Sequence, residues 1–338
     1  MLQIKSNYSL QPLNTFGIQA NAKFYLRIDS AEQLPKLVIN PVYRNNEVFI
    51  LGGGSNILFT DNFEGLVLHV NIQGIEKADE DDTSVLIVAG GGIVWDEFVS
   101  YAVSNNWGGI ENLSAIPGTV GAAPMQNIGA YGVEVKDWIE KVEGYDFTQQ
   151  QFLSFSNKEC RFQYRDSLFK QKFRNRFVIT RVFFRLKKAP HKLITRYGDI
   201  ARQLNELPEQ NIAALRELII HIRESKLPDY RKKGNAGSFF KNPVLQHEQV
   251  LPLKKEYPDM PVFPDEKGKE KLSAAWLIDK AGCKGIQQGK AGTHPQHALV
   301  LINLGGATGS EIFRLAQQIQ KTVREKFGIM LEPEVNIL

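Results

Sequence analysis

A turn rich in glycine is the first feature of the chain whose residue types and spacing could do chemistry. Gly52-Gly53-Gly54-Ser55-Asn56 follows a short β-prone run, and its three glycines permit left-handed backbone angles and close approach of a ligand. Successive N–H groups in such a turn can form an anion-binding nest for a diphosphate. The turn is not a P-loop, because no Gly-Lys-Ser/Thr follows, and Asn56-Ile57 stand where a dinucleotide-binding fingerprint needs its last glycine. An ordinary tight turn is the simpler interpretation of a single glycine triplet.

A second segment of similar character strengthens the ligand-binding interpretation. Residues 110–132 show neither helical nor strand periodicity and are rich in glycine, alanine and proline. Connections this long with such small side chains usually bind something. The sequence therefore offers two backbone-rich loops that could line one ligand.

Three further segments carry side chains that could act on a bound molecule. Arg165 is most simply a surface residue or the partner of an acid, although its planar fork could hold a carboxylate or a developing oxyanion. Ser238 lies between glycine and phenylalanine, which is not a nucleophile elbow, and a serine in such a turn is usually a turn former. Glu332 and Glu334 flank a proline and look like surface acids on one side of a terminal strand.

The segment 158–188 holds 11 Lys or Arg and two acids, with aromatic residues between them, although the whole chain has a net charge of only +4. Basic and aromatic residues together are typical of a nucleic-acid surface. They equally fit an exposed strand pair with solvated charges, or a positive field for a small polyanionic substrate. Composition does not choose among these three interpretations.

The length and composition exclude several classes of protein. A chain of 338 residues with 43% hydrophobic and 23% charged residues is expected to form about two globular domains. It has no apolar run long enough for a membrane helix and no signal-peptide core, so we expect a cytoplasmic protein. Cys160 and Cys283 stand alone, and His294 and His297 lack partner carboxylates, so we expect no disulfide scaffold and no metal site.

Periodicity predicts the elements that must position these candidates. Strands are expected over 47–51, 65–70, 84–89 and 178–186, and a last strand over 329–338. Helices are expected over 96–105, 213–225 and 310–326. Residues 187–210 read as a polar excursion, and a domain boundary is expected near residue 212.

Taken together, the motifs resemble the UDP-N-acetylenolpyruvoylglucosamine reductases, the flavoenzymes of bacterial peptidoglycan precursor synthesis. The resemblance extends over nearly the whole chain. Pro124 and the excursion with Tyr197 are similar to the type I branch of that family. The motifs that carry it are Asn14-Thr15-Phe16-Gly17, Gly52-Gly53-Gly54-Ser55-Asn56, residues 116–124, residues 126–132, Tyr164-Arg165-Asp166-Ser167, residues 237–243 and Glu332-Pro333-Glu334.

The resemblance implies an α+β fold built on an FAD-binding domain of the vanillyl-alcohol-oxidase type, followed by an α+β substrate-binding domain. The last strand would return to the first domain. The implied ranges are 1–212 for the FAD-binding domain, with lobes of about 1–70 and 71–212 and a tyrosine loop at 187–210, then 213–327 for the substrate domain and 328–338 for the returning strand.

The resemblance also implies the reaction. Hydride would pass from NADPH to non-covalently bound FAD and then to the enolpyruvyl ether of UDP-N-acetylglucosamine, giving UDP-N-acetylmuramate. Arg165 matches the position that polarises the substrate carboxylate, Glu334 matches its companion, and Ser238 matches the proton donor. Such donors aimed at developing charge are typically worth about 10²–10³ in rate each. The protein would act as a monomer on small molecules, without nucleic acid or membrane.

Other positions match binding residues of the family by resemblance. His297 stands where glutamine is common. The residues matched to FAD are Gly52, Gly53, Gly54, Ser55, Asn56, Ile116, Pro117, Gly118, Gly121, Ala122, Gln126, Asn127, Gly129, Ala130 and Tyr131, and those matched to substrate are Tyr164, Tyr197, Lys226, Asn242 and His297. Two alternatives remain open: another FAD-dependent oxidase or dehydrogenase of this fold, and a nucleic-acid-binding module that uses residues 158–188.

Overall fold

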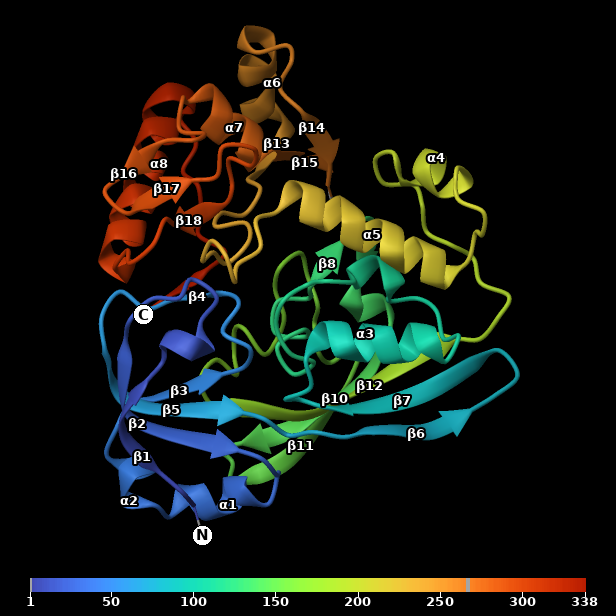
Figure 1. Ribbon diagram of the computed structural model, residues 1–338, viewed down its shortest axis with the longest axis vertical. Helices are drawn as coiled ribbons and strands as arrows, with labels where there is room; N and C mark the ends of the chain where they lie inside the picture. Colours follow the sequence, from blue (N-terminus) through green and yellow to red (C-terminus); the bar gives the residue numbers. More distant parts are fainter. Residues whose placement is uncertain (1, 266–267) are drawn as a thin grey trace. The chain divides into compact units, whose positions relative to one another are not determined.

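The computed structural model describes residues 2–265 and 268–338 and divides into two compact units (Figure 1). The first unit comprises Met1–Tyr8, Ala22–Gly54 and Phe63–Ser225, and the second comprises Ser9–Asn21, Ser55–Asn62 and Lys226–Leu338. The second unit therefore takes two short segments from the first quarter of the chain. The change of unit near residue 225 also differs from the boundary expected near residue 212, because the helix in between packs with the first unit.

One sheet of the first unit has the strand order β1-β2-β5-β3, and β5 pairs in parallel with both β2 and β3. The central strand β5 is buried on both faces, as expected for a parallel strand that is covered on both sides. Leu26, Leu34 and Leu68 belong to the core that it shares with the first helices. The bounds are β1 Lys5–Ser9, β2 Asn21–Ile28, β3 Val48–Leu51, β5 Phe63–Val70, α1 Gln33–Val38 and α2 Pro41–Arg44.

The other large sheet of the first unit is antiparallel, with the order β11-β10-β12-β7-β6. Trp95 and Phe98 at the beginning of α3 pack against Phe184 of β12, with ring centroids 5.9 and 4.6 Å apart. This aromatic contact fixes α3 on the sheet. The bounds are β6 Ile75–Glu80, β7 Ser84–Gly90, α3 Trp95–Ser104, β10 Ile139–Asp146, β11 Gln151–Ser156 and β12 Phe177–Lys187.

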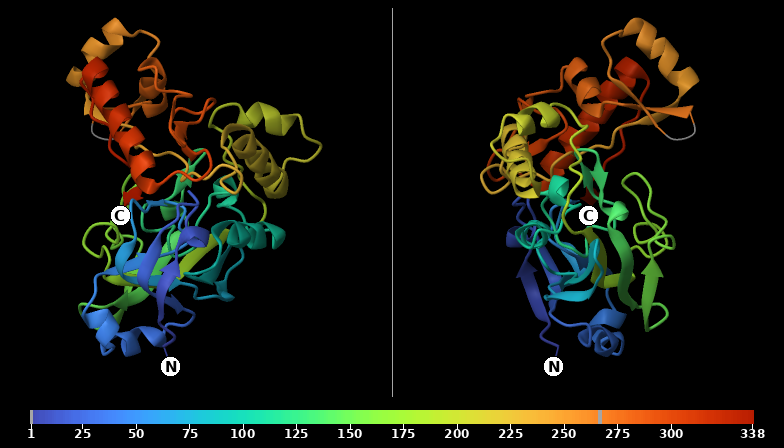
Figure 2. Two further views of the ribbon diagram at one scale, coloured as in Figure 1. Left: turned by 60° about the vertical axis from the view of Figure 1, so that its left-hand side comes forward. Right: turned by 90° about the vertical axis from the view of Figure 1, so that its right-hand side faces the viewer.

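Short elements and two further helices complete the first unit. Helix α5 buries Leu215 and Ile219 against Leu204 of α4, and the two helices lie side by side in Figure 2. Thus the polar excursion expected at 187–210 contains a helix. The bounds are η2 Glu111–Leu113, β8 Gly129–Ala130, β9 Val133–Glu134, η3 Val135–Asp137, α4 Ile200–Asn205 and α5 Ile212–Lys226.

The second unit is organised around α8, which begins with a capping box of Thr308 and Glu311 and ends at Gly328 in the left-handed conformation. The strand expected over 329–338 is regular only in β19, which pairs in parallel with β4. The sheets are β13-β15-β14 and β16-β17-β18. The bounds are η1 Gln11–Leu13, β4 Ile57–Leu58, β13 Val244–Gln246, α6 His247–Glu256, β14 Val262–Pro264, β15 Lys269–Leu272, α7 Ala274–Lys280, β16 Gln287–Gln288, β17 Ala291–Thr293, β18 Leu301–Asn303, α8 Gly309–Phe327 and β19 Asn336–Ile337.

No helix in residues 2–265 and 268–338 combines the length and the apolar character that crossing a bilayer requires. Both cysteines are buried and free, and burial raises the pKa of the Cys160 thiol to about 12.

Candidate active site

The two glycine-rich loops of the sequence meet in the first unit, backbone against backbone. A Cβ on Gly53 would lie 2.9 Å from Cα of Gly118, and a Cβ on Gly52 would lie 2.9 Å from Oγ1 of Thr119. Side chains at these positions would force the loops apart. The close approach explains why glycine is required at both positions, which periodicity alone did not show.

A third glycine-rich turn, at Gly91, packs against the 110–132 loop. The Gly121 N–H donates to the Gly91 carbonyl at 2.9 Å, and a Cβ on Gly121 would lie 2.9 Å from that oxygen. Gly91 lies just beyond the end of β7, so the antiparallel sheet positions the long loop.

The 110–132 loop is held in strained conformations by bonds to its neighbours. Ala115, Asn127 and Tyr131 have positive φ angles of 55°, 44° and 50°. Such angles cost non-glycine residues roughly 1–2 kcal/mol each, so surrounding contacts must hold them. Trp95 contributes two of these contacts, since its N–H donates to the Gly118 carbonyl at 3.0 Å and its indole Nε1 donates to the Leu113 carbonyl at 2.8 Å.

A partly buried ion pair supports this loop. Both guanidinium nitrogens of Arg216 donate to the carboxylate of Asp96, at 2.7 and 2.9 Å, and Asp96 also accepts the Ala115 N–H at 2.6 Å. Burial opposes ionisation of Asp96, but the hydrogen bonds from Arg216 and Ala115 outweigh it and lower its pKa. Sequence inspection missed this pair because its members are 120 residues apart.

The turn that carries Arg165 lies against the same loop. Gln163 and Asp166 exchange backbone hydrogen bonds of 3.0 and 3.2 Å, and Arg165 between them has a φ of 55°. A positive φ at this place in a turn is normally filled by glycine, so an arginine here is strained. The Arg165 Nη2 donates to the Gly129 carbonyl at 3.0 Å, which joins the guanidinium to the 110–132 loop.

In the second unit, the segments of Ser238 and Glu334 are adjacent. The Glu334 N–H donates to the Phe239 carbonyl at 2.8 Å, and Lys241 N–H donates to the Glu332 carbonyl at 2.9 Å. On its other side the Ser238 segment pairs with the chain at Val300. Both Ser238 and Glu334 are half-buried. Two candidates that are nearly 100 positions apart in the sequence are therefore neighbours in this unit.

Of the matched substrate positions in the second unit, Lys226 and His297 lie near each other, and Asn242 lies at the beginning of α7. Burial is the main reason that the pKa of His297 is lowered, and nearby His294 and Lys226 lower it further, so Lys226 lies close enough to act on His297. The His297 Nδ1 is buried without a hydrogen-bond partner among the described residues. Asn242 accepts the Ala274 N–H at 3.0 Å, at the beginning of α7. An anionic ligand would find a cation and a ring nitrogen here.

The matched tyrosines lie in the first unit. The Tyr131 and Tyr197 rings meet edge to face, with centroids 5.8 Å apart, and Tyr197 is 56% exposed. Burial raises the pKa of Tyr131. Tyr164 lies beside the Arg165 guanidinium, 5.5 Å from ring centroid to Cζ. The rings thus flank the long loop and the Arg165 turn.

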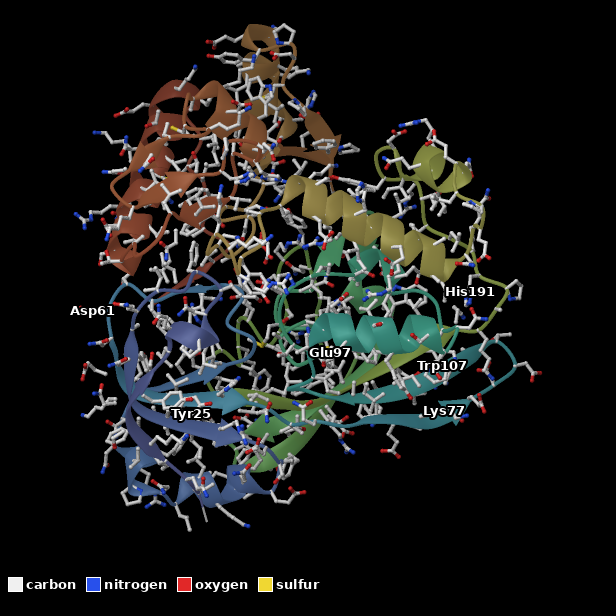
Figure 3. All side chains as sticks on the ribbon, viewed as in Figure 1. Tyr25, Asp61, Lys77, Glu97, Trp107 and His191 are labelled. Carbon is white, nitrogen blue, oxygen red and sulfur yellow. The ribbon has the colours of Figure 1, made fainter. Side chains whose placement is uncertain are left out.

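Part of the basic segment 158–188 is an ion-paired sheet surface. Lys77 of β6, labelled in Figure 3, pairs with Glu80 of the same strand at 2.8 Å. Acids of β6 and β10 face the basic residues on and beside β12. The pairs are Asp146–Arg176 at 2.6 Å, Glu143–Arg181 at 2.6 Å, Glu140–Arg185 at 2.7 Å and Glu80–Lys188 at 2.9 Å. For its strand portion, these ion pairs agree with the interpretation as an exposed strand pair.

The first unit fits an extended cofactor with a diphosphate. Gly52 and Gly53 pack closely against the Gly118–Thr119 segment, and the buried Oγ1 of Thr119 beside them has no hydrogen-bond partner among the described residues. Buried hydroxyl groups nearly always have a hydrogen-bond partner, so a bound ligand could supply the one that Thr119 lacks. Thr119 was not among the residues expected from the sequence, although it lies inside the predicted loop.

Comparison with known proteins gives matches along the whole chain. Residues 22–147 match the family model described as FAD binding domain, and residues 229–338 match the model of the UDP-N-acetylenolpyruvoylglucosamine reductase C-terminal domain. The UDP-N-acetylenolpyruvoylglucosamine reductase of Flavobacterium johnsoniae is 43% identical, and the alignment covers 100% of both chains. The protein of the same name from Chromobacterium violaceum is 46% identical over 100% of this chain and 99% of its own.

A solved structure shows the same fold. The crystal structure of UDP-N-acetylenolpyruvylglucosamine reductase from Thermus caldophilus superposes with a TM-score of 0.69 and 22% identity, covering 100% of this chain and 98% of the other. The expected fold class, α+β with an FAD-binding domain, is thereby confirmed.

Proposed function

Because the chain belongs to the UDP-N-acetylenolpyruvoylglucosamine reductase family and is an FAD-containing oxidoreductase, we propose that it reduces UDP-N-acetylglucosamine enolpyruvate to UDP-N-acetylmuramate with NADPH. The single structural observation that supports this reaction is the hydrogen bond from the Glu334 N–H to the Phe239 carbonyl. It makes the segments of two proposed catalytic residues neighbours, as proton delivery beside a stabilised anion requires.

We assign the cofactor to the first unit. The glycine loops at Gly52–Gly54 and 116–131 would hold FAD, with backbone groups near the diphosphate and the long loop along the cofactor. When bound, FAD supplies the site that accepts a hydride from NADPH and returns it to the substrate. The closely packed backbones and the unpaired hydroxyl of Thr119 support this assignment.

The reacting groups come from three segments. Reduction of an enolpyruvyl ether at its methylene carbon moves electron density onto the adjacent carbon and the carboxylate. We assign the Arg165 guanidinium and Glu334 to stabilise that charge, and the Ser238 hydroxyl to deliver a proton to the carbon that did not receive hydride. Serine is a weak acid, so it can serve only because the intermediate is a strong base.

The nucleotide end of the substrate is assigned to the remaining candidates. Lys226 and His297 act on each other electrostatically and would face the diphosphate, together with Asn242. Tyr164 and Tyr197 of the first unit are also assigned to the substrate. We further propose that the enzyme works as a cytoplasmic monomer without nucleic acid, and the ion pairs along β12 support the last point.

An anaerobic titration tests the proposal. The purified protein should be yellow, its flavin absorbance should bleach on addition of NADPH, and the enolpyruvyl nucleotide should then restore the oxidised spectrum. A colourless protein that neither takes up FAD nor oxidises NADPH would refute the assignment. Rapid reoxidation by oxygen with no response to the nucleotide would favour a different oxidase of this fold.

A further inference from the structure

The turn of Arg165 is held at both of its ends by one short stretch of the 110–132 loop. On one side, the Ser167 hydroxyl donates to the Met125 carbonyl at 2.7 Å, and on the other the Asn127 Nδ2 donates to the Gln163 carbonyl at 3.1 Å. Ser167 is 2% exposed and Asn127 is fully buried. We propose that Ser167 and Asn127 are positioning residues that hold Arg165 in its strained conformation and thereby aim its guanidinium.

The hydrogen bonds of both side chains are made within the protein. The Ser167 Oγ also accepts the Phe169 N–H at 3.2 Å. The Asn127 Nδ2 also donates to Glu134 Oε2 at 3.0 Å, and its Oδ1 accepts the Lys136 N–H at 3.1 Å. An amide nitrogen has two hydrogens to donate, and both are used here. The resemblance matched Asn127 to FAD, but its carboxamide is better suited to fixing the turn.

The strain explains why such clamps are needed. A left-handed arginine persists only where neighbouring contacts fix it, and without them the turn would relax toward other angles. The clamps reach from the loop assigned to FAD, so they would hold Arg165 at a constant place relative to that loop. Displacing a reacting group by about 1 Å can cost roughly 100-fold in rate.

The inference rests on the proposed function, since it concerns the step that Arg165 assists. Ser167→Ala and Asn127→Gly each remove one clamp, and glycine keeps the positive φ of residue 127 without a Cβ. We expect either variant to slow reoxidation of the reduced flavin by the enolpyruvyl nucleotide about 10- to 100-fold. For Ser167→Ala, reduction by NADPH should change less than about twofold, because neither Ser167 nor Arg165 is assigned a part in it. Equal slowing of both half-reactions in this variant, or an unchanged reoxidation, would overturn the inference.

A double-mutant cycle separates positioning from general stability. In an Arg165→Lys background, Ser167→Ala should cause no further loss of reoxidation, because the group that it aims has already been replaced. Independent, multiplying losses would overturn the proposal. A second readout needs no turnover: calorimetric binding of the enolpyruvyl nucleotide to the oxidised enzyme should weaken in Ser167→Ala, and again should not weaken further in the double variant.

Ser84→Ala is the matched control, since Ser84 is also a buried serine of the first unit and donates to Asp81 at 2.8 Å. It should lower the melting temperature of the apoprotein about as much as Ser167→Ala while leaving nucleotide binding unchanged. If Ser84→Ala weakened nucleotide binding equally, Ser167 would have only a structural role. A wild-type enzyme that bleached with NADPH but ignored the nucleotide would instead refute the proposed substrate.

Discussion

The Asn56 carboxamide donates to the main-chain carbonyl of Glu334 at 3.2 Å, and the Asn56 carbonyl in turn accepts the Asn336 N–H at 3.1 Å. The end of the first glycine turn is therefore bonded to the strand that carries a proposed catalytic acid. Both residues belong to the second unit, where β4 and β19 continue the pairing. Glu334 is held from two sides, by Asn56 and by Phe239.

Asn56→Ala should loosen this strand. Loss of one partly buried hydrogen bond is expected to lower the free energy of unfolding by about 1 kcal/mol and to slow flavin reoxidation by the nucleotide more than flavin reduction. Asn62→Ala is a matched control, because Asn62 is exposed and its side-chain Oδ1 accepts the Asn21 N–H at 2.8 Å. Chemical denaturation and stopped-flow absorbance give the two quantities, and identical kinetics in both variants would contradict the role.

Gly53→Ala should weaken FAD binding by at least about tenfold, or 1.4 kcal/mol, because its Cβ would meet the Gly118 backbone at 2.9 Å. Gly328→Ala is the control. Gly328 has a φ of 68° and no atom within 4 Å of its added Cβ, so only backbone strain of about 1 kcal/mol is expected there. Fluorescence titration of the apoproteins with FAD measures both affinities. Equal FAD affinity in the two variants would show that the close packing of Gly53 against Gly118 is not needed for FAD binding.

Arg216→Ala should destabilise the protein by roughly 2–3 kcal/mol, because it leaves the Asp96 carboxylate without its charged partner. Arg202→Ala removes an exposed arginine that pairs with Asp199 and Glu206, and it should destabilise the protein far less than Arg216→Ala, because water screens an exposed pair. Urea unfolding of both variants distinguishes the two cases. A similar small loss in each would mean that the Arg216–Asp96 pair does not support the long loop.

The stability of the protein should fall as the pH drops below about 6.5, in part because of His297. Burial is the main cause of its lowered pKa in the fold, so the unfolded chain takes up a proton first and is favoured as the solution becomes acidic. His297→Gln should therefore reduce the loss of stability between pH 7.5 and 5.5. Denaturation at the two pH values tests this, and an unchanged pH dependence would show that His297 ionises equally in both states.

The three helices expected from the sequence are present as α3, α5 and α8, whereas α1, α2, α4, α6 and α7 were not predicted. The stripes at 213–225 and 310–326 became α5 and α8 with ends shifted by about one residue, because a continuous apolar face leaves a clear period. Strand β6 was missed. Five of its six residues are exposed, so it has no buried face to reveal it.

The division into two units could not be predicted from local sequence patterns. Residues 9–21 join the second unit through contacts such as the bond from the Asn235 N–H to the Thr15 carbonyl, at 3.0 Å. Gly234 lies so near that an added Cβ would be 2.1 Å from the Phe16 carbonyl. Contacts between segments more than 200 residues apart leave no periodic signal.

The candidate site was likewise predicted only in part. The similar composition of the two glycine loops led to the expectation that they line one ligand, and in the structure Gly53 and Gly118 touch. The clamps on Arg165 were not foreseen, because a serine and an asparagine in turns look like ordinary turn formers. Only their partners, Met125 and Gln163, reveal what they hold.

Single-turnover kinetics of Ser238→Ala under anaerobic conditions test the central claim most directly. Ser238 is assigned to deliver a proton to the substrate and has no part in taking hydride from NADPH. The variant should therefore bleach its flavin with NADPH at nearly the wild-type rate and be reoxidised by the enolpyruvyl nucleotide about 10²–10⁴ times more slowly. Equal losses in the two half-reactions, or full reoxidation at the wild-type rate, would contradict the account.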